Sequence, residues 1–195
     1  MNHLQPTTYN LQPPRRRSRR RSGFTLIEAA LTTVIVGTGV LSIVAAQQAY
    51  HQKNNWATRT GEAVLLANEL RELTMTLPQH DPITGRSNFG PEAGENGILD
   101  YDDLDDFAGV VASGTGTGLT FNPPVNALRQ SLPELSQWTQ RINVTNVTAD
   151  HINSPFTQPL GSTPVVRVDV TVLYTDPLTG QTNTVTELNW IVTDE

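Results

Sequence analysis

The chain has 195 residues and a formal net charge of −6 at pH 7, from 13 basic and 19 acidic side chains. It contains no cysteine, which excludes disulfide bridges, thiol catalysis and cysteine-ligated zinc. This length suits one modest globular domain together with an N-terminal membrane segment.

The N-terminal part of the chain changes from polar to basic to apolar. Residues 1–14 are polar and contain proline, without an apolar period, and they predict a disordered leader. Six arginines follow at positions 15–21, and an apolar run then occupies residues 24–46. As a helix this run would be about 35 Å long, enough to cross a hydrocarbon core of about 30 Å. The arginines favour a cytoplasmic N-terminus, so the sequence predicts a single membrane anchor.

Glu28 is the one formal charge between Arg21 and Lys53, and it lies one turn into the apolar run. A carboxylate at bilayer depth costs about 2.5–3.5 kcal/mol or more, and such residues usually have a partner or a role. One interpretation is a plain signal anchor whose Glu28 lies near the lipid headgroups. A secretory signal, with residues 44–46 as its small-residue site, and a twin-arginine signal are two further alternatives. Neither of these two signals explains the carboxylate.

The residues around Glu28 favour another interpretation. Gly23-Phe24-Thr25-Leu26-Ile27-Glu28, behind a basic leader and before a long apolar run, resembles the N-terminal signature of type IV prepilins and pseudopilins. The resemblance implies that a membrane prepilin peptidase/methyltransferase cuts between Gly23 and Phe24 on the cytoplasmic side and methylates Phe24. It also implies that Glu28 serves assembly by neutralising the N-terminal amine of an adjacent pilin or pseudopilin subunit. We therefore expect a minor pilin or pseudopilin of a type IV pilus or a type II secretion pseudopilus.

This interpretation has consequences for location and partners. The precursor would cross the inner membrane once, and the mature chain would join a pilus or pseudopilus in the periplasm or at the cell surface. Removing residues 1–23 deletes six arginines and no acid, which leaves 7 basic and 19 acidic side chains and a charge of −12. That charge argues against nucleic-acid binding by the mature form, because phosphate contacts need clustered lysine and arginine.

A competing class is an uncleaved, signal-anchored extracytoplasmic domain with a binding or enzymatic role. The four histidines, at positions 3, 51, 80 and 151, belong to no metal-binding or nucleophile motif. We therefore do not expect an enzyme.

Helical periodicity continues beyond the apolar run as far as Pro78, which ends it. Apolar residues recur at helical spacings at Trp56, Ala63, Leu66, Leu70, Leu73 and Leu77. Residues 24–46 are thus expected to form a transmembrane or filament-core helix. Residues 47–77 are expected to form its amphipathic continuation, which carries a globular head of residues 78–195.

The head is predicted to begin with loops and to end with strands. Residues 78–125 are rich in turn formers, and Asp-Pro-x-Thr-Gly at 81–85 and at 176–180 predicts two similar turns. Alternating apolar and polar residues predict an antiparallel β-meander over about residues 138–193. The expected fold class is α+β and pilin-like: a long N-terminal helix, apolar in its first half, packed against a C-terminal antiparallel sheet.

An acidic run lies within the predicted loops of the head. Its five carboxylates belong to Asp100, Asp102, Asp103, Asp105 and Asp106. They could hold a calcium ion, although the glycine and the terminal glutamate of an EF-hand are missing. The alternative is a solvated loop that Tyr101, Leu104 and Phe107 fix onto the head. Together with residues 89–95 before it, the run resembles a loop that recurs in prepilin-type proteins. No other cofactor is expected.

Overall fold

The computed structural model describes residues 23–112 and 114–194. The chain divides into two compact units, Met1–Tyr50 and His51–Glu195. The predicted disordered leader, residues 1–14, and the arginines lie outside the described residues.

One long helix, α1, spans Leu26–Met75. The predicted range is residues 24–77, so the helix is two residues shorter at each end. At the C-terminal end a turn separates Met75 from Pro78. Every described residue of the first unit is exposed. By length and composition, α1 contains a stretch that is apolar enough to cross a membrane.

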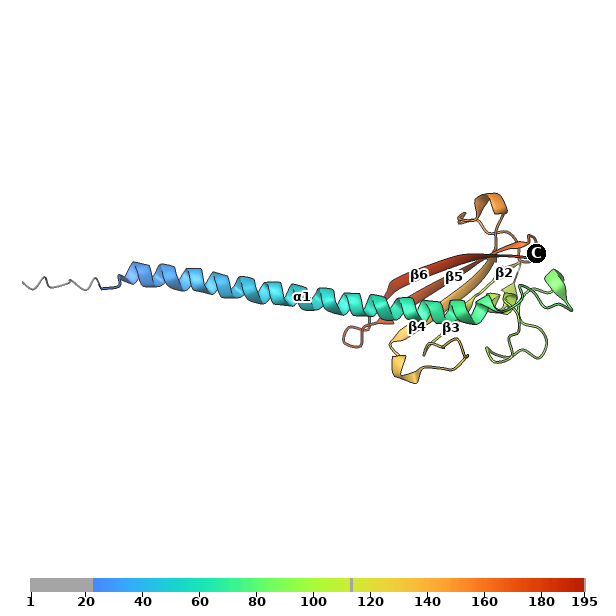
Figure 1. Ribbon diagram of the computed structural model, residues 1–195, viewed down its shortest axis with the longest axis horizontal. Helices are drawn as coiled ribbons and strands as arrows, with labels where there is room; N and C mark the ends of the chain where they lie inside the picture. The colour runs from blue at the N-terminus through green and yellow to red at the C-terminus, as the bar shows by residue number, and fades with distance from the viewer. Residues whose placement is uncertain (1–22, 113, 195) are drawn as a thin grey trace, which may run out of the picture. The chain divides into compact units, whose positions relative to one another are not determined.

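The second unit contains a four-stranded antiparallel sheet in the order β3-β4-β5-β6 (Figure 1). Its strands are β3 (Leu119–Phe121), β4 (Trp138–Asn146), β5 (Val165–Thr175) and β6 (Thr182–Thr193). The last three follow one another in the chain and in space, which confirms the predicted meander. Val168 shows the register, because it lies opposite Val144 on β4 and Trp190 on β6.

The sequence predicts loops over residues 78–125, but the structure also has strands in this segment. Strand β3 extends the main sheet, and β1 (Val111–Ala112) pairs with β2 (Thr115–Gly116) in a separate small hairpin. Four short 3₁₀ helices complete the described elements: η1 (Gly85–Ser87), η2 (Asp105–Ala108), η3 (Pro133–Leu135) and η4 (Ala149–His151).

The core lies between the C-terminal part of α1 and one face of the sheet (Figure 1). The helix contributes Ala63, Leu66, Ala67, Leu70 and Leu73, and the strands contribute Ile142, Val144, Val166, Val168, Val170 and Val172. The predicted apolar stripe is thus confirmed over residues 63–73. It is wrong at Trp56, whose side chain is 68% exposed.

Gln140 ties helix, sheet and loop together inside this core. Its side chain is fully buried, and its Nε2 donates to the carbonyls of Leu66, at 2.7 Å, and Val125, at 3.1 Å. Its Oε1 accepts the N–H of Val125 at 2.8 Å. A buried amide of this kind fixes one arrangement of the three segments, because any other arrangement leaves its polar atoms unpaired.

The segment between α1 and β1 packs within the second unit, against both the end of α1 and the sheet. The N–H of Leu104 donates to the carbonyl of Pro78 at 2.9 Å, and η2 contacts β4. The Tyr101 and Phe107 rings meet edge to face, with centroids 5.6 Å apart. All three apolar side chains of the acidic run are buried, as predicted. This packing determines where the neighbouring carboxylates lie.

Candidate functional site

The predicted cleavage site lies just before α1. Gly23, Phe24 and Thr25 are exposed and have no regular secondary structure, and the Phe24 side chain is 68% exposed. A peptidase needs to bind its substrate in an extended, accessible form. Gly23 and Phe24 are accessible in this sense and lie outside the helix.

The hydroxyl groups of the apolar stretch are all paired within their own helix. Thr25 accepts the Glu28 N–H at 3.3 Å through Oγ1, in the manner of an N-cap residue. The other hydroxyls donate to backbone carbonyls of the preceding turn, at distances of 2.7–3.0 Å: Thr32 to Glu28, Thr33 to Ala29, Thr38 to Val34 and Ser42 to Thr38. Such internal pairing suits a helix surrounded by lipid or by other apolar helices.

The Glu28 carboxylate is different. Among the described residues it has neither a hydrogen bond nor an ion pair, although its backbone N–H is capped by Thr25. Its position in the first turn is favourable for a negative charge, because the N-terminal end of a helix carries partial positive charge. Within residues 26–46, it is the one side-chain polar group that the described structure leaves unpaired.

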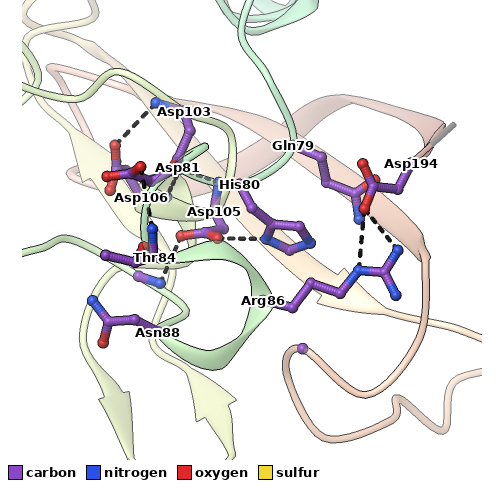
Figure 2. Close-up of polar contacts among 12 residues, drawn as sticks. Gln79, His80, Asp81, Thr84, Arg86, Asn88, Asp103, Asp105, Asp106 and Asp194 are labelled. Atoms are coloured by element: carbon purple, nitrogen blue, oxygen red, sulfur yellow. Dashed lines mark hydrogen bonds and ion pairs between the residues drawn. The ribbon is translucent and has the colours of Figure 1, made fainter.

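A second group of polar side chains gathers in the segment between α1 and β1 (Figure 2). His80 Nδ1 lies 2.6 Å from Asp105 Oδ2, and both side chains are buried. The second carboxylate oxygen of Asp105 accepts the N–H of Gly90 at 2.8 Å. Asp105 is therefore fully used in holding three parts of this segment together.

Asp103 and Asp106 are also fully buried, but each has only one oxygen that is paired. Asp103 Oδ1 accepts the N–H groups of Asp105 and Asp106, at 2.9 and 3.2 Å. Asp106 Oδ2 accepts those of Asp102 and Asp103, at 3.0 and 3.3 Å. Asp103 Oδ2 and Asp106 Oδ1 are buried without a hydrogen-bond partner among the described residues. No basic side chain of the described chain forms an ion pair with either carboxylate.

These surroundings disfavour the charged form of both carboxyls. Burial, followed by the negative charge of Asp105, raises the pKa of Asp103 to about 7. Burial, followed by the charge of Asp103, raises the pKa of Asp106 to about 8, and the neighbouring Glu95 acts in the same direction. Burial also raises the pKa of the nearby Tyr101 hydroxyl, with Asp106 as the next cause. A cation at this position would reverse these effects for the carboxyls.

Two overlapping sets of carboxylates have oxygens that lie within 4.8 Å of one another. One set is Asp102, Asp103 and Asp106, and the other is Glu92, Glu95 and Asp106. We call these five residues the carboxylate cluster. Two of its members carry other bonds as well: Glu92 Oε1 accepts the Thr84 hydroxyl at 2.8 Å, and Glu95 Oε2 accepts the Glu92 N–H at 2.8 Å.

The structure separates the five predicted calcium candidates. Asp102, Asp103 and Asp106 come together, whereas Asp105 pairs with His80, and Asp100 is exposed and accepts the Asn96 N–H at 3.2 Å. The alternative, a solvated loop fixed onto the head by its apolar side chains, is right for those side chains but wrong for Asp103, Asp105 and Asp106, which are buried. Glu92, Glu95 and His80 were not predicted as site residues. The one available signal was the pairing of residues 89–95 with the acidic run in a single recurrent loop.

Comparisons with family models, curated proteins and solved structures found no match to this chain. The similarity to prepilins thus rests on the residues from Gly23 to Glu28 and their setting. What it implies is taken up below as a proposal.

Proposed function

We propose that this chain is the precursor of a minor pilin or pseudopilin, which a prepilin peptidase cuts between Gly23 and Phe24. The mature chain would then join a type IV pilus or a type II secretion pseudopilus as a structural subunit. One observation carries the proposal: Glu28 presents an unpaired carboxylate within an apolar stretch whose hydroxyls are all paired.

Cleavage would supply the partner that Glu28 lacks. A cut after Gly23 removes the six arginines and creates an α-ammonium group on Phe24. A single ammonium or carboxylate in an apolar environment is expensive, and the two together cost much less when they form a hydrogen-bonded pair. Pairing between the Phe24 amine of one copy and the Glu28 carboxylate of another would therefore favour assembly over a solitary helix in lipid.

The exposed apolar side chains of α1 support the same proposal. Leu26, Ile27 and Leu41 are all at least 70% exposed, and the first unit buries none of its described residues. Such a surface needs an apolar cover in every state of the protein. Lipid would provide it in the inner-membrane precursor, and the helices of neighbouring subunits would provide it in a filament.

A Glu28→Gln variant tests the pairing role. Glutamine keeps the size of the side chain and suits the same helix position, since either Glu or Gln serves at the third residue of a capping box. We expect Glu28→Gln to be cleaved normally and to be recovered in filaments at less than a tenth of the wild-type amount. The measurement is quantitative immunoblotting of sheared filaments and membranes from cells that contain the pilus machinery.

Glu62→Gln provides the matched control, because Glu62 is an exposed glutamate on the same helix but outside the apolar stretch. It should assemble like the wild type. Equal recovery of Glu28→Gln and Glu62→Gln in filaments would contradict the proposed pairing. An uncleaved, membrane-bound chain in the same cells would instead favour the signal-anchored binding or enzymatic domain.

A further inference from the structure

The strongest unexplained feature outside the cleavage segment is the pair of unpartnered oxygens on Asp103 and Asp106. Both side chains are 0% exposed, and each already binds two backbone N–H groups through its other oxygen. Buried polar atoms nearly always have a partner, and an unpaired buried carboxylate is among the most expensive arrangements in a protein. These two atoms therefore indicate a ligand that satisfies both.

The distances fit a metal ion. Oxygens that bind one calcium ion each lie about 2.3–2.6 Å from it, so two of them are separated by at most about 5 Å. The oxygens of each carboxylate set lie within 4.8 Å of one another, and Asp106 belongs to both sets. Backbone N–H groups hold one oxygen of Asp103 and one of Asp106, and the other oxygen of each carboxylate has no hydrogen-bond partner among the described residues.

The donors also indicate which ion would bind. Every ligand atom in the two sets is a carboxylate oxygen, which is what hard divalent cations prefer. Zinc favours nitrogen and sulfur ligands, and His80, the histidine of this region, belongs to neither carboxylate set. Magnesium needs near-ideal octahedral geometry and keeps much of its water, whereas calcium accepts irregular sets of several carboxylates.

We propose that the carboxylate cluster binds one calcium ion, with Asp103 and Asp106 as its central ligands. Asp102, Glu92 and Glu95 complete the negatively charged surroundings. Asp102 is exposed and the two glutamates are half-buried, so the ion can reach the buried pair from solvent along this side. This proposal goes beyond the proposed pilin function and does not depend on it, because the cluster is separate from the residues at the start of α1.

Calcium would have a structural effect in the second unit. It would join the 92–95 turn to η2, which packs on β4, while the His80–Asp105 pair and the Leu104–Pro78 hydrogen bond connect the same segment to the end of α1. An ion that binds only the folded cluster stabilises the folded chain by mass action. Calcium would thus determine how firmly the segment between α1 and β1 is held on the sheet.

The test uses the full chain, purified in detergent and freed of metal with a chelator that is then removed. We expect isothermal titration with calcium chloride to give one site per chain, and the melting temperature to rise with calcium concentration. Magnesium at the same concentration should raise it much less. Terbium provides an independent probe, since Tyr101 lies beside the cluster and should sensitise the luminescence of bound terbium. Added calcium should then lower this luminescence by displacing terbium.

Two variants assign the site. Asp106→Asn should weaken calcium binding at least tenfold, since Asp106 belongs to both carboxylate sets, while the amide oxygen can still accept the N–H groups of Asp102 and Asp103. Asp150→Asn, at an exposed acid in η4, should bind calcium like the wild type. The proposal is overturned if millimolar calcium gives neither heat nor a change in melting temperature with the folded wild type. It is equally overturned if magnesium matches calcium, or if Asp150→Asn weakens binding as much as Asp106→Asn does.

Discussion

Raising the pH of the metal-free chain is expected to destabilise its second unit. Burial and the negative charge of Asp105 raise the pKa of Asp103 from 3.8 to about 7, and burial and the charge of Asp103 raise that of Asp106 from 3.8 to about 8. Between about pH 4 and pH 7 both carboxyls are therefore protonated in the folded chain and ionised in the unfolded chain. Because the folded state then binds more protons, the free energy of unfolding falls as the pH rises. The full contribution is present only below the unfolded pKa of 3.8 and is lost by about pH 8.

The size of the effect follows from the number of protons released. Each carboxyl that is protonated only in the folded state lowers the free energy of unfolding by about 1.4 kcal/mol per pH unit. From about pH 5 to pH 7 one such carboxyl gives a loss of about 3 kcal/mol, which in a unit of this size corresponds to a fall of about 10 °C in Tm. Near-ultraviolet circular dichroism of the full chain in detergent with a chelator measures this, since Trp138 is buried in the second unit.

Two variants and one addition sharpen the experiment. Asp106→Asn removes one titrating carboxyl, so its Tm should depend less on pH and should exceed the wild-type value at about pH 8. Asp150→Asn should follow the wild type. Saturating calcium should flatten the wild-type curve, because the ion favours the charged carboxylates. A wild-type Tm that stays constant or rises between about pH 5 and pH 7 without metal would refute the reasoning.

Three further substitutions test the packing of the second unit, each by thermal or denaturant unfolding of the full chain. Gln140→Leu should lower the free energy of unfolding by about 1–3 kcal/mol, because the Val125 N–H loses its partner in the core. Phe107→Ala should lower it by about 3–5 kcal/mol, since Phe107 is fully buried against the sheet. Gly90→Ala should cost about 1–3 kcal/mol, because Gly90 has φ +94° and an added Cβ would lie 2.9 Å from the Gly109 carbonyl oxygen. A loss below about 0.5 kcal/mol in any of the three would contradict the contact it tests.

Much of the fold could be predicted because it follows from local periodicity. The helical spacing between residues 63 and 73 and the alternation along β5 from Val166 to Val172 each define one buried face, and the two faces meet in the core. The two Asp-Pro-x-Thr-Gly segments form matching turns. In each, the carbonyl of the aspartate accepts the glycine N–H at 2.8 Å, and the glycine has φ of +62° or +69°.

Features that depend on contacts distant in sequence could not be predicted. Charged residues are normally exposed. The sequence of the acidic run therefore did not indicate that Asp103 and Asp106 would be buried while Asp100 and Asp102 stayed exposed. Their burial follows from the packing of Leu104 and Phe107 on either side of them. Trp56 fits the helical stripe but is exposed. Its exposure could not be predicted, because periodicity alone does not tell where the sheet ends along α1.

The position of Glu28 could be predicted as unusual, because a lone charge in an apolar run is visible in the sequence. What the structure adds is its contrast with the neighbouring polar groups. Thr32, Thr33, Thr38 and Ser42 are satisfied within the helix, and the carboxylate is not. That contrast supports the proposal that Glu28 pairs with an N-terminal amine, which the Glu28→Gln variant tests.

The mature N-terminus tests the central claim most directly. Intact-mass and N-terminal peptide mass spectrometry should be applied to the chain isolated from cells that contain a prepilin peptidase, with a Gly23→Val variant as the uncleaved control. We predict a wild-type chain that begins at N-methylated Phe24 and lacks residues 1–23, and a control that retains them. A wild-type chain that keeps its arginines, or that begins after residues 44–46, would contradict the proposed function.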